Sequence, residues 1–491
     1  MSKIALPVAE LKPALTGLGK IVSKRCTLPV LNHLKIERTG DGWIALTGTD
    51  LDHFVTVRLE QPSDGEPLSL LVPYDELLKI TKNCQKTDKI LVGADDPECI
   101  TIEYAIGNQI AEAKVESLPV EEFPEIPRIK GEPIPLNDAL RQSIHEALDC
   151  ASTDETRLIL NGAFIDTGKP EAHYIVGTDG RHLFSSNSFS LPLKDSLIIP
   201  THKFIEWKEF NNDGEWQLKV QPPEKKDEPS HLQISTRRWR YITRQIEGNY
   251  PNWRQVVPTD FNTSVEFDPS SVDAVVQLIE RMPEHDAVNR TIGIEVKDRR
   301  VNILCKANKE QEKWTSVEVK DPTTKGKDVT VYLNRHLLVK ALSFGLTQLD
   351  IIDSISPVRF SRDGRQMIVM PIRTTDAPKP TPSVPESTSQ PAAPPQAANE
   401  ERKTPMPKTA SNGNGNTTNT NGNGNGQHEE KSSIQSAVDQ IETIKESLKT
   451  AKDGLHALTD MLKQVQRDQK TSEREVQSVR TTLEKLQTMK L

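Results

Sequence analysis

One sequence pattern occurs three times within residues 1–373, and it restricts this part of the chain to folds built from three similar units. Gly48-Thr49-Asp50 recurs as Gly177-Thr178-Asp179, and Lys306-Ala307-Asn308 stands at the same spacing again. Each tripeptide follows a strand-like run of apolar residues. Matching strands precede the tripeptides at equal spacing and begin at Leu31, Leu160 and Asn289. The sequence therefore predicts three copies of one folding unit.

The repeat also predicts the secondary structure of each unit. The first unit opens with apolar residues at helical spacing, as on the buried face of a helix: Val8, Leu11, Leu15, Leu18 and Val22. Each unit then has a strand that leads into a second helix, at residues 71–74, 199–201 and 332–335. Pro73 and Pro200 suit the first turn of such a helix, where a missing N–H costs nothing. We expect an α+β protein with two helices packed on antiparallel sheets in each of three domains, 1–127, 128–258 and 259–373.

Two different segments follow the repeats. Residues 374–431 are rich in Pro, Asn, Gly and Ser, and such a composition buries too little apolar surface to fold, which predicts a disordered linker. Residues 432–491 carry apolar side chains on two seven-residue registers, which predicts a coiled coil. The first register holds Ile434, Ile441, Leu448, Leu455, Leu462, Val476 and Leu483; the second holds Ala437, Ile444, Ala451, Leu458, Val465, Val479 and Leu486.

The coiled coil leaves two questions open. Gln469 and Ser472 interrupt the apolar seam, so the helix either continues or folds back there as a hairpin. An oligomerising helix is the simpler interpretation of the heptads, and recruitment of a different protein is the alternative.

Composition excludes several classes of protein. No run of about 18 apolar residues is present, and the first residues lack the apolar core of a secretory signal, so we expect a cytoplasmic protein without a membrane partner. The five cysteines are scattered and form no C-x-x-C pair, which argues against a zinc or redox motif. The net charge of −8 opposes nucleic-acid binding only if the charge is evenly spread, because screening separates surfaces more than about 10 Å apart.

Basic residues are placed on the expected helices of all three units. Phosphate contacts from such residues are independent of sequence and sensitive to salt. An ordinary solvated helix face is the alternative for each of them taken singly. The candidates are Lys12, Lys20, Lys24, Lys79, Lys82 and Lys86 in the first unit, Arg141, Lys203 and Lys208 in the second, and Arg281, Arg335 and Lys340 in the third.

Several motifs, in the right order and spacing, resemble the bacterial DNA polymerase III β sliding clamp family over residues 1–373. Residues 27–32 (TLPVLN) and 46–52 (LTGTDLD) resemble its first domain, and 160–162 (LNG) with 177–183 (GTDGRHL) its second. Residues 247–253 (EGNYPNW) with Val257-Pro258 resemble the junction into its third domain, and 369–373 (VMPIR) its C-terminal end.

The resemblance implies a non-catalytic processivity factor with no cofactor and no metal. Two chains of this family join head to tail into a six-domain ring, a homodimer that encircles double-stranded DNA. Its partners are the replicative DNA polymerase catalytic subunit, the clamp loader and other proteins with a clamp-binding motif, and it acts at the nucleoid. Loop arginines that approach DNA in the family are matched by Arg25 and Arg157.

The family binds partner peptides in a groove between its second and third domains. Three positions depart from the family pattern: Arg181-His182 stands in reversed order, Gln255 replaces a basic residue, and Pro357 replaces a small polar one. These changes affect polar recognition and leave the apolar pocket. The matching positions are Leu160, Thr178, Gly180, Arg181, His182, Leu183, Pro251, Val256, Val369, Met370, Pro371, Ile372 and Arg373.

Parts of the sequence are also compatible with two other functions. Asp50, Asp52 and His53, or Asp179 and His182, are residue types that can hold a metal in an enzyme, but a turn shared by the repeats explains both clusters equally well. A scaffold organised by the coiled coil, with the repeats kept only for dimerisation, is the second alternative. No G-x-x-x-x-G-K-[ST] motif is present, so the chain is not expected to be an ATP-driven loader.

Overall fold

The structure is a computed structural model that describes residues 3–22, 27–96, 99–170, 172–222, 230–308 and 313–373. The expected linker and coiled coil lie outside these residues, as do Lys24 and Arg25. Within the described ranges, no helix is long and apolar enough to span a membrane.

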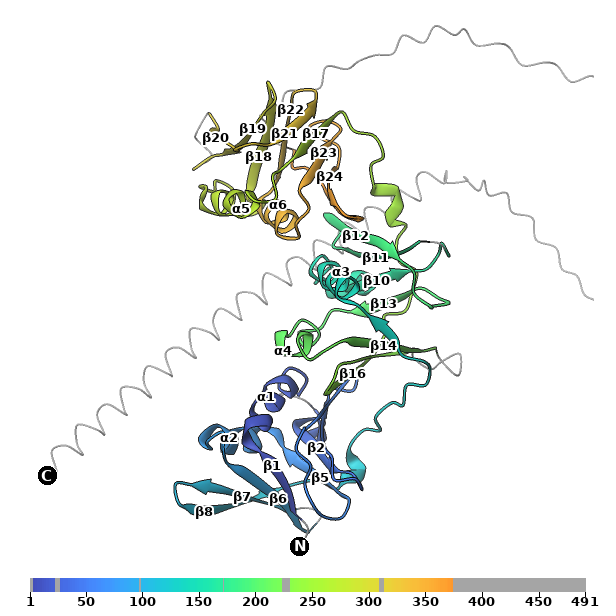
Figure 1. Ribbon diagram of the computed structural model, residues 1–491, viewed down its shortest axis with the longest axis vertical. Helices are drawn as coiled ribbons and strands as arrows, with labels where there is room; N and C mark the ends of the chain where they lie inside the picture. Colours follow the sequence, from blue (N-terminus) through green and yellow to red (C-terminus); the bar gives the residue numbers. More distant parts are fainter. Residues whose placement is uncertain are drawn as a thin grey trace, which may run out of the picture. The chain divides into compact units, whose positions relative to one another are not determined.

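The elements of the described part recur in one order, which is strand, helix, four strands, helix and three strands (Figure 1). The first repeat consists of β1 (Lys3–Pro7), α1 (Val8–Leu18), β2 (His33–Arg38), β3 (Ile44–Thr49), β4 (His53–Arg58), β5 (Leu68–Pro73), α2 (Tyr74–Asn83), β6 (Lys89–Asp96), β7 (Cys99–Ile106) and β8 (Gln109–Glu116). The second consists of β9 (Ile134–Leu136), α3 (Asp138–Asp149), β10 (Gly162–Asp166), β11 (His173–Thr178), β12 (His182–Phe189), β13 (Leu197–Pro200), α4 (Lys208–Asn211), β14 (Trp216–Gln221), β15 (His231–Ser235) and β16 (Trp239–Arg244).

The third repeat has the same order with one added strand, β21. It consists of β17 (Thr263–Glu266), α5 (Val272–Arg281), β18 (Thr291–Lys297), β19 (Arg300–Cys305), β20 (Thr315–Glu318), β21 (Thr323–Gly326), β22 (Val329–Asn334), α6 (Arg335–Ser343), β23 (Gln348–Ile351), β24 (Val358–Arg362) and β25 (Arg365–Val369). The α+β fold of three repeated units is therefore confirmed.

Two of the four sheets continue from one repeat into the next. The eight-stranded sheet has the order β5-β2-β3-β4-β16-β15-β14-β9, and the nine-stranded sheet has the order β13-β10-β11-β12-β25-β24-β23-β17-β21. Antiparallel pairing of β4 with β16 joins the first repeat to the second, and pairing of β12 with β25 joins the second to the third. Neighbouring repeats thus share backbone hydrogen bonds.

Alternation along the strands sets which face of each sheet is buried. In β2 the side chains of Leu34 and Ile36 are fully buried, whereas Lys35 and Glu37 lie on the opposite, partly exposed face, as the two-residue period of a strand requires. Helices cover the apolar face: α1 packs with α2 in the first repeat and α5 with α6 in the third (Figure 1). All five residues of the predicted helical stripe, from Val8 to Val22, are buried, but α1 ends at Leu18, so Val22 lies beyond the helix.

The second helix of the middle repeat differs from the prediction. The sequence predicts that this helix begins at residues 200–201. Instead, the chain forms a turn at residues 203–206, and α4 spans only four residues, Lys208–Asn211. The side-chain amide of Asn211 donates to the carbonyls of Ile205 and Trp207, at 3.2 and 3.0 Å. The Trp207 carbonyl also accepts from the Asn211 backbone amide at 3.1 Å, whereas the Ile205 carbonyl is bound by the side chain, which stabilises the turn against a longer helix.

Helix α1 makes a close contact at the junction of the first two repeats. A Cβ atom on Gly17 would lie 2.5 Å from ring atoms of both Trp207 and Trp239, closer than van der Waals contact allows. The two indole rings pack edge to face with their centroids 5.3 Å apart, so neither can move without disturbing the other.

We predict that Gly17→Ala destabilises the chain by about 1–3 kcal/mol, the usual cost of overpacking a well-filled core. Alanine in place of glycine inside a helix ordinarily stabilises by roughly 1 kcal/mol, so loss of stability identifies the tryptophan contact. Chemical denaturation followed by circular dichroism measures the effect. Thr16→Ala, at the neighbouring exposed position of α1, is the control. A Gly17→Ala chain as stable as the control contradicts this packing.

Candidate functional site

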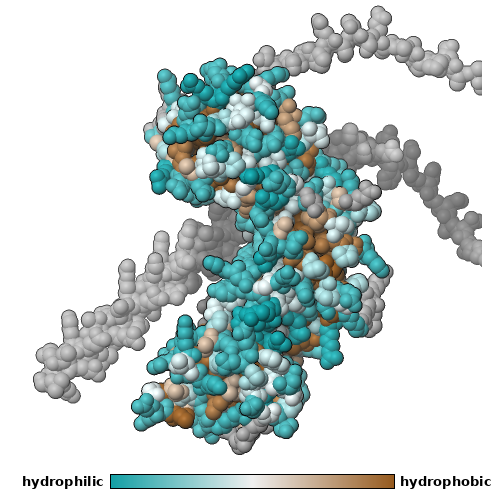
Figure 2. Space-filling view, in the orientation of Figure 1, coloured by the Kyte–Doolittle hydropathy of each residue, from teal (hydrophilic) through white to brown (hydrophobic). Residues whose placement is uncertain are grey.

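A pocket of about 170 Å³ lies where the second repeat meets the third. Pairing of β12 with β25 builds its floor, and the surface over β11 and β12 is hydrophobic (Figures 1 and 2). Its lining combines three segments that are distant in sequence: Leu160, Thr178, Gly180, Arg181, His182, Leu183, Tyr250, Pro251, Asn252, Trp253, Val256, Ile368 and Met370. Nine of these are positions that the sequence predicted, from Leu160 through Val256 to Met370.

Four predicted groove residues lie elsewhere. Val369 is fully buried in the main core, and its neighbour Ile368 lines the pocket instead. The reason is strand alternation, because adjacent residues of β25 point to opposite faces of the sheet. Pro371, Ile372 and Arg373 follow the strand and are not part of this pocket. The amide of Ile372 donates to the carbonyl of Tyr332 at 2.7 Å.

A tight turn between β11 and β12 forms one wall. The Thr178 hydroxyl donates to the carbonyl of His182 at 2.5 Å and accepts from the amide of Gly180 at 3.1 Å. An Asp179 carboxylate oxygen accepts from the amide of His182 at 3.0 Å. Gly180 has φ of +85°, which glycine adopts at no steric cost.

The charges of this turn are fixed by its own hydrogen bonds. Burial acts to raise the pKa of Asp179, but the His182 ring and the amides of Arg181 and His182 outweigh it and hold that pKa at about 2. The His182 Nδ1 atom lies 2.8 Å from an Asp179 oxygen, within ion-pair distance. The carboxylate is therefore charged at neutral pH and serves the turn, while the pocket itself presents mainly apolar groups.

The opposite wall is an aromatic segment that sequence reasoning largely missed. Trp253 donates its indole N–H to Asp166 at 2.9 Å, and Tyr250 stacks on Phe164 with ring centroids 4.4 Å apart. These anchors fix the η4 turn (Trp253–Val256) over β10. The motif at 247–253 contains both aromatics, so the signal was present, but only Pro251 was taken from it.

Exposure divides the basic residues that sequence singled out into two groups. Five are exposed and so accessible to a polyanion: Lys79, Lys82, Lys86, Lys203 and Arg281. Lys208, the first residue of α4, is also exposed. Arg157 is exposed but pairs with Asp154 at 2.9 Å and donates to the Asp179 carbonyl at 3.0 Å.

Four other candidates, and Arg335 as a fifth, are engaged within the protein. Lys12 donates to the Cys84 carbonyl at 2.8 Å, and Lys20 lies over the Trp207 ring at 5.8 Å. Lys340 donates to the carbonyl of Asp149, the last residue of α3, at 2.6 Å. Arg141 donates to the carbonyls of Asn211 and Gly214.

Arg335 corrects the prediction most clearly. It is only 7 % exposed, and its guanidinium donates to the carbonyls of Met282 and Pro283 at 2.7 and 2.6 Å. These carbonyls follow the end of α5, where a cation is favourable. Arg335 therefore links α6 to α5 and does not face solvent. Lys86 was placed on the second helix, but α2 ends at Asn83.

The turn at Thr178 has a counterpart in the first repeat. The Thr49 hydroxyl donates to the His53 carbonyl and accepts from the Leu51 amide, and Asp50 accepts from the His53 amide. Leu51 has φ of +81°, the counterpart of Gly180. The Asp50–His53 and Asp179–His182 pairs thus occupy one repeated turn, as the sequence suggested.

In the first repeat this turn also meets His202 of the second. The rings of His53 and His202 stack with centroids 4.3 Å apart, and burial, with the nearby His53, lowers the pKa of His202 to about 4. Asp50, His53 and His202 are the residue types of a metal site. However, His53 Nδ1 contacts Asp50 at 3.0 Å and His202 Nδ1 accepts from the Phe204 amide at 3.1 Å. A ring that accepts at Nδ1 carries its proton on Nε2, so His202 has no lone pair left for a metal.

Comparisons with known proteins agree with this architecture. Residues 4–127 match the family described as DNA polymerase III beta subunit, N-terminal domain. The beta sliding clamp of Escherichia coli K12 is 24 % identical over 363 residues, which cover 71 % of this chain and 93 % of that protein. The Streptococcus pneumoniae beta sliding clamp is 22 % identical over 379 residues, covering 74 % and 96 %.

Solved structures share the fold. The DNA polymerase III subunit beta from Pseudomonas aeruginosa has a TM-score of 0.64 and 21 % identity, covering 76 % of this chain and 100 % of that one. The beta subunit from DNA polymerase of Streptococcus pyogenes has a TM-score of 0.65 and 19 % identity, with coverage of 76 % and 100 %.

Proposed function

The chain belongs to the bacterial β sliding clamp family, and on this premise we propose that it is a DNA sliding clamp: two copies close into a ring that encircles duplex DNA and tethers the replicative polymerase. The observation that carries this proposal is the rule by which successive repeats pair their strands. In this proposal 1–127, 128–258 and 259–373 are the three domains of each half-ring.

The strand-pairing rule leaves one unmatched pair of edges. In the first repeat the strand that pairs onward is β4, and its partner is β16, the last strand of the second repeat. The second repeat follows the same rule with β12 and β25. The equivalent strands that remain are β20 in the third repeat and β8 in the first, each an edge of a four-stranded sheet. A second copy of the chain offers the missing partner for each.

Closure by β20 and β8 satisfies both copies at once. Exposed sheet edges are sites of association unless they are covered, and a closed two-fold arrangement covers both without starting a filament. Two large apolar residues at the β7–β8 hairpin support an interface here, because Ile106 is 59 % exposed and Ile110 is 80 % exposed. In this proposal the homodimer closes through domains one and three, at these edges.

We propose DNA contacts from exposed basic residues on the helices and in the segments next to them. Lys79 and Lys82 lie on α2 and Arg281 lies on α5, whereas Lys86 follows α2, Lys203 lies in the turn before α4, and Arg157 lies in the segment before β10. Contacts from such residues to phosphates carry no sequence information, so they attract the duplex without holding the ring at one site. Lys24 and Arg25 remain candidates from the sequence.

The apolar pocket between the second and third repeats is our proposed partner site. Extended peptides commonly bind in apolar grooves with a few polar anchors, and this pocket has that character. We propose that peptide segments of the polymerase catalytic subunit, the clamp loader and other clamp-binding proteins compete for it. The chain then needs no catalytic group of its own, because holding a polymerase near the primer end raises its effective concentration. On this proposal the clamp acts at the nucleoid in the cytoplasm.

Replacing Lys79 and Lys82 together by Gln should weaken the association with DNA and reduce its dependence on salt. Each phosphate contact contributes about 0.9 to the slope of log affinity against log salt, so the double variant should lose about 1.8. The measurement is retention on primed circular DNA after loading, over a series of salt concentrations, with polymerase extension as the second readout.

Lys320→Gln with Lys325→Gln is the matched control, because both lysines are exposed and neither lies on a helix. Equal slopes for the two double variants remove the helices from the DNA contact. Encirclement is contradicted if the unmodified chain does not stay on closed circular DNA after loading. It is also contradicted if the chain leaves linear DNA with blocked ends as fast as it leaves linear DNA with open ends. No stimulation of the polymerase favours a scaffold instead.

Ile110→Asp should open the ring, because burying an unpaired carboxylate in an interface is costly. We expect residues 1–384, which form one compact unit, to have the mass of a dimer by light scattering and the variant to have the mass of a monomer. In the full-length chain, a coiled coil that pairs keeps the Ile110→Asp variant dimeric even when the ring is open. Comparing the masses of the two lengths therefore distinguishes pairing through the ring from pairing through the tail. Val288→Asp, at another highly exposed apolar residue, is the control, and a dimeric Ile110→Asp form of residues 1–384 contradicts the interface.

Val256→Asp and Met370→Asp should each weaken polymerase binding by roughly tenfold or more, because a carboxylate desolvated against an apolar ligand costs over 1.4 kcal/mol. Both residues lie at the pocket and are 39 % and 38 % exposed, so the fold should tolerate them. Surface plasmon resonance with the polymerase catalytic subunit measures the loss. Val288→Asp again serves as the control, and unchanged affinity in both pocket variants excludes this groove.

A further inference from the structure

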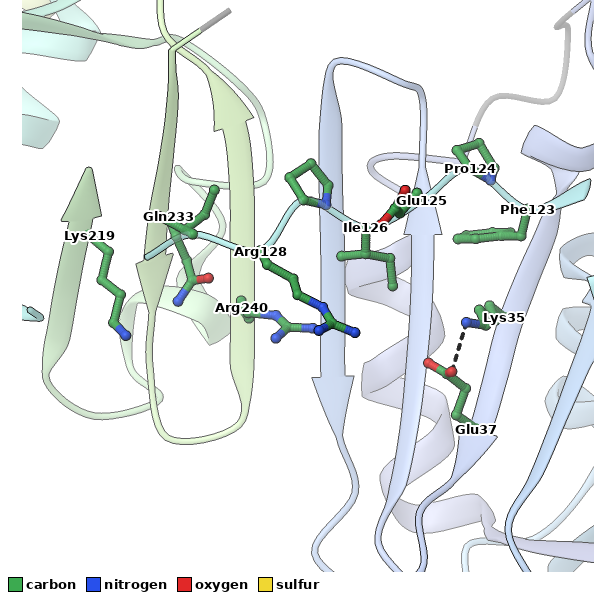
Figure 3. Close-up of a pocket in the computed structure, with 12 residues that line it drawn as sticks. Lys35, Glu37, Phe123, Pro124, Glu125, Ile126, Arg128, Lys219, Gln233 and Arg240 are labelled. Carbon is green, nitrogen blue, oxygen red and sulfur yellow. Dashed lines mark ion pairs between the residues drawn. The ribbon is translucent and has the colours of Figure 1, made fainter. Parts of the chain in front are cut away.

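A cavity of about 500 Å³ lies on the far side of the eight-stranded sheet, away from the helices and from the apolar pocket. It lies between the sheet and a strap, residues 123–129, which connects the first repeat to the second (Figure 3). The proposed function uses neither the cavity nor the strap. Its lining includes Lys35, Glu37, Arg128, Lys219, Gln233 and Arg240.

The strap is held at both ends, so the cavity is a fixed feature of the junction. Phe123 is 7 % exposed and packs in a small apolar cluster with Val30, Leu31 and Leu71 of the first repeat. Beyond the cavity, the amide of Lys130 donates to the side chain of Gln221, on β14 of the second repeat, at 3.0 Å.

Strand register places the polar side chains of the sheet on one face. Arg240 on β16 is opposite Thr56 on β4, and its guanidinium donates to the Thr56 hydroxyl at 3.4 Å. Lys219 on β14 is opposite Gln233 on β15. Directly opposed residues point to the same side of an antiparallel sheet, so these groups face the strap together, and Arg128 reaches toward them from the strap (Figure 3).

The cavity carries an excess of positive charge. Lys35 is neutralised by Glu37 at 2.7 Å. Among the described residues, no carboxylate lies within ion-pair distance of Arg128, Lys219 or Arg240, and Glu125 is the one further acidic residue of the lining. Burial also lowers the pKa of Arg240, against the opposing effect of Glu37. This cluster of unpaired cations stands out in a chain whose net charge is −8.

The Arg128 and Arg240 side chains lie together on this side of the sheet (Figure 3), and Lys219 lines the same cavity from β14, two strands away. Such a set of cations suits a ligand with several negative oxygens. Guanidinium forks bind phosphate oxygens in pairs, and a lysine adds a point charge. We propose that this cavity binds an oligophosphate group, either free, as in pyrophosphate, or carried by a nucleotide. Such a ligand touches the first repeat, the strap and the second repeat together, so it stiffens their junction.

The test is isothermal titration of the full-length chain with pyrophosphate, with dATP and with adenosine, at constant ionic strength. We expect pyrophosphate and dATP to bind and adenosine not to bind, and the thermal unfolding midpoint to rise with ligand concentration. Equal affinity for pyrophosphate and dATP means that the phosphate chain alone is recognised, whereas tighter binding of dATP means that the nucleoside adds contacts; both support the site.

Arg240→Gln and Arg128→Gln should each weaken binding by roughly 10- to 100-fold, the usual effect of losing a hydrogen bond to a charged group. Arg128 lies exposed on the strap, so its removal leaves the sheet intact even where Arg240→Gln alters stability. Lys194→Gln, an exposed lysine outside the cavity, is the control. Three results each overturn the proposal. The first is pyrophosphate binding no stronger than that of a simple added salt, and the second is an affinity unchanged in both arginine variants. The third is tighter binding of an acidic peptide than of pyrophosphate. The mass of residues 1–384 by light scattering, measured without nucleotide or pyrophosphate, should remain that of a dimer in the Arg128 variant, so failure of this site is distinguishable from failure of the clamp.

Discussion

Backbone hydrogen bonding at the edges of the sheets is the constraint from which the rest of the structure follows. Each repeat, taken alone, has two half-sheets with open edges, and an open edge associates with whatever strand it meets. The chain closes two of these edges internally, through β4 with β16 and β12 with β25. Because both pairings obey one rule, the helices of successive repeats cover the same side of continuous sheets, and the apolar pocket forms where the second such pairing is made.

One local turn serves different purposes in different repeats. The Thr-Asp turn has the same hydrogen bonds at Thr49 and Thr178, but what lies beside it differs. In the first repeat it meets His202 and helps to hold two repeats together. In the second repeat the same turn borders an open pocket. The third copy of the tripeptide, Lys306-Ala307-Asn308, has lost the Thr and Asp. The first two repeats thus share the local structure of this turn, whereas its role depends on which residues lie beside it in each repeat.

The repeat and the helical stripe were predictable from sequence because both are periodic, and periodicity reflects burial directly. Nine groove positions also emerged, through resemblance to a family. The failures have identifiable causes. Ile368 and Val369 are both apolar, so only the strand register decides which one faces the pocket. Arg335 has the same charge as an exposed arginine, and no neighbouring residue in the sequence indicates that it binds the carbonyls after α5. The shortness of α4 depends on a side-chain amide, that of Asn211.

The cavity beneath the strap was beyond the reach of sequence for a related reason. Its cations come from β14, β16 and the strap, which are separate segments of the chain. In the sequence, each of these cations alone resembles an ordinary surface residue. Only the strand register brings them to one face.

The covalent connections between successive repeats determine where the proposed ring can open. The first junction is spanned by the strap and the second by the segment through η4, so breaking either pairing leaves its strands tethered at a high effective concentration. The junction between β20 and β8 joins two separate chains and has no such tether. Loss of that pairing alone converts a closed ring into an open one without unfolding any repeat. In the proposed ring, this is the one kind of junction that no covalent segment spans, so the repeat architecture itself determines where the ring can open.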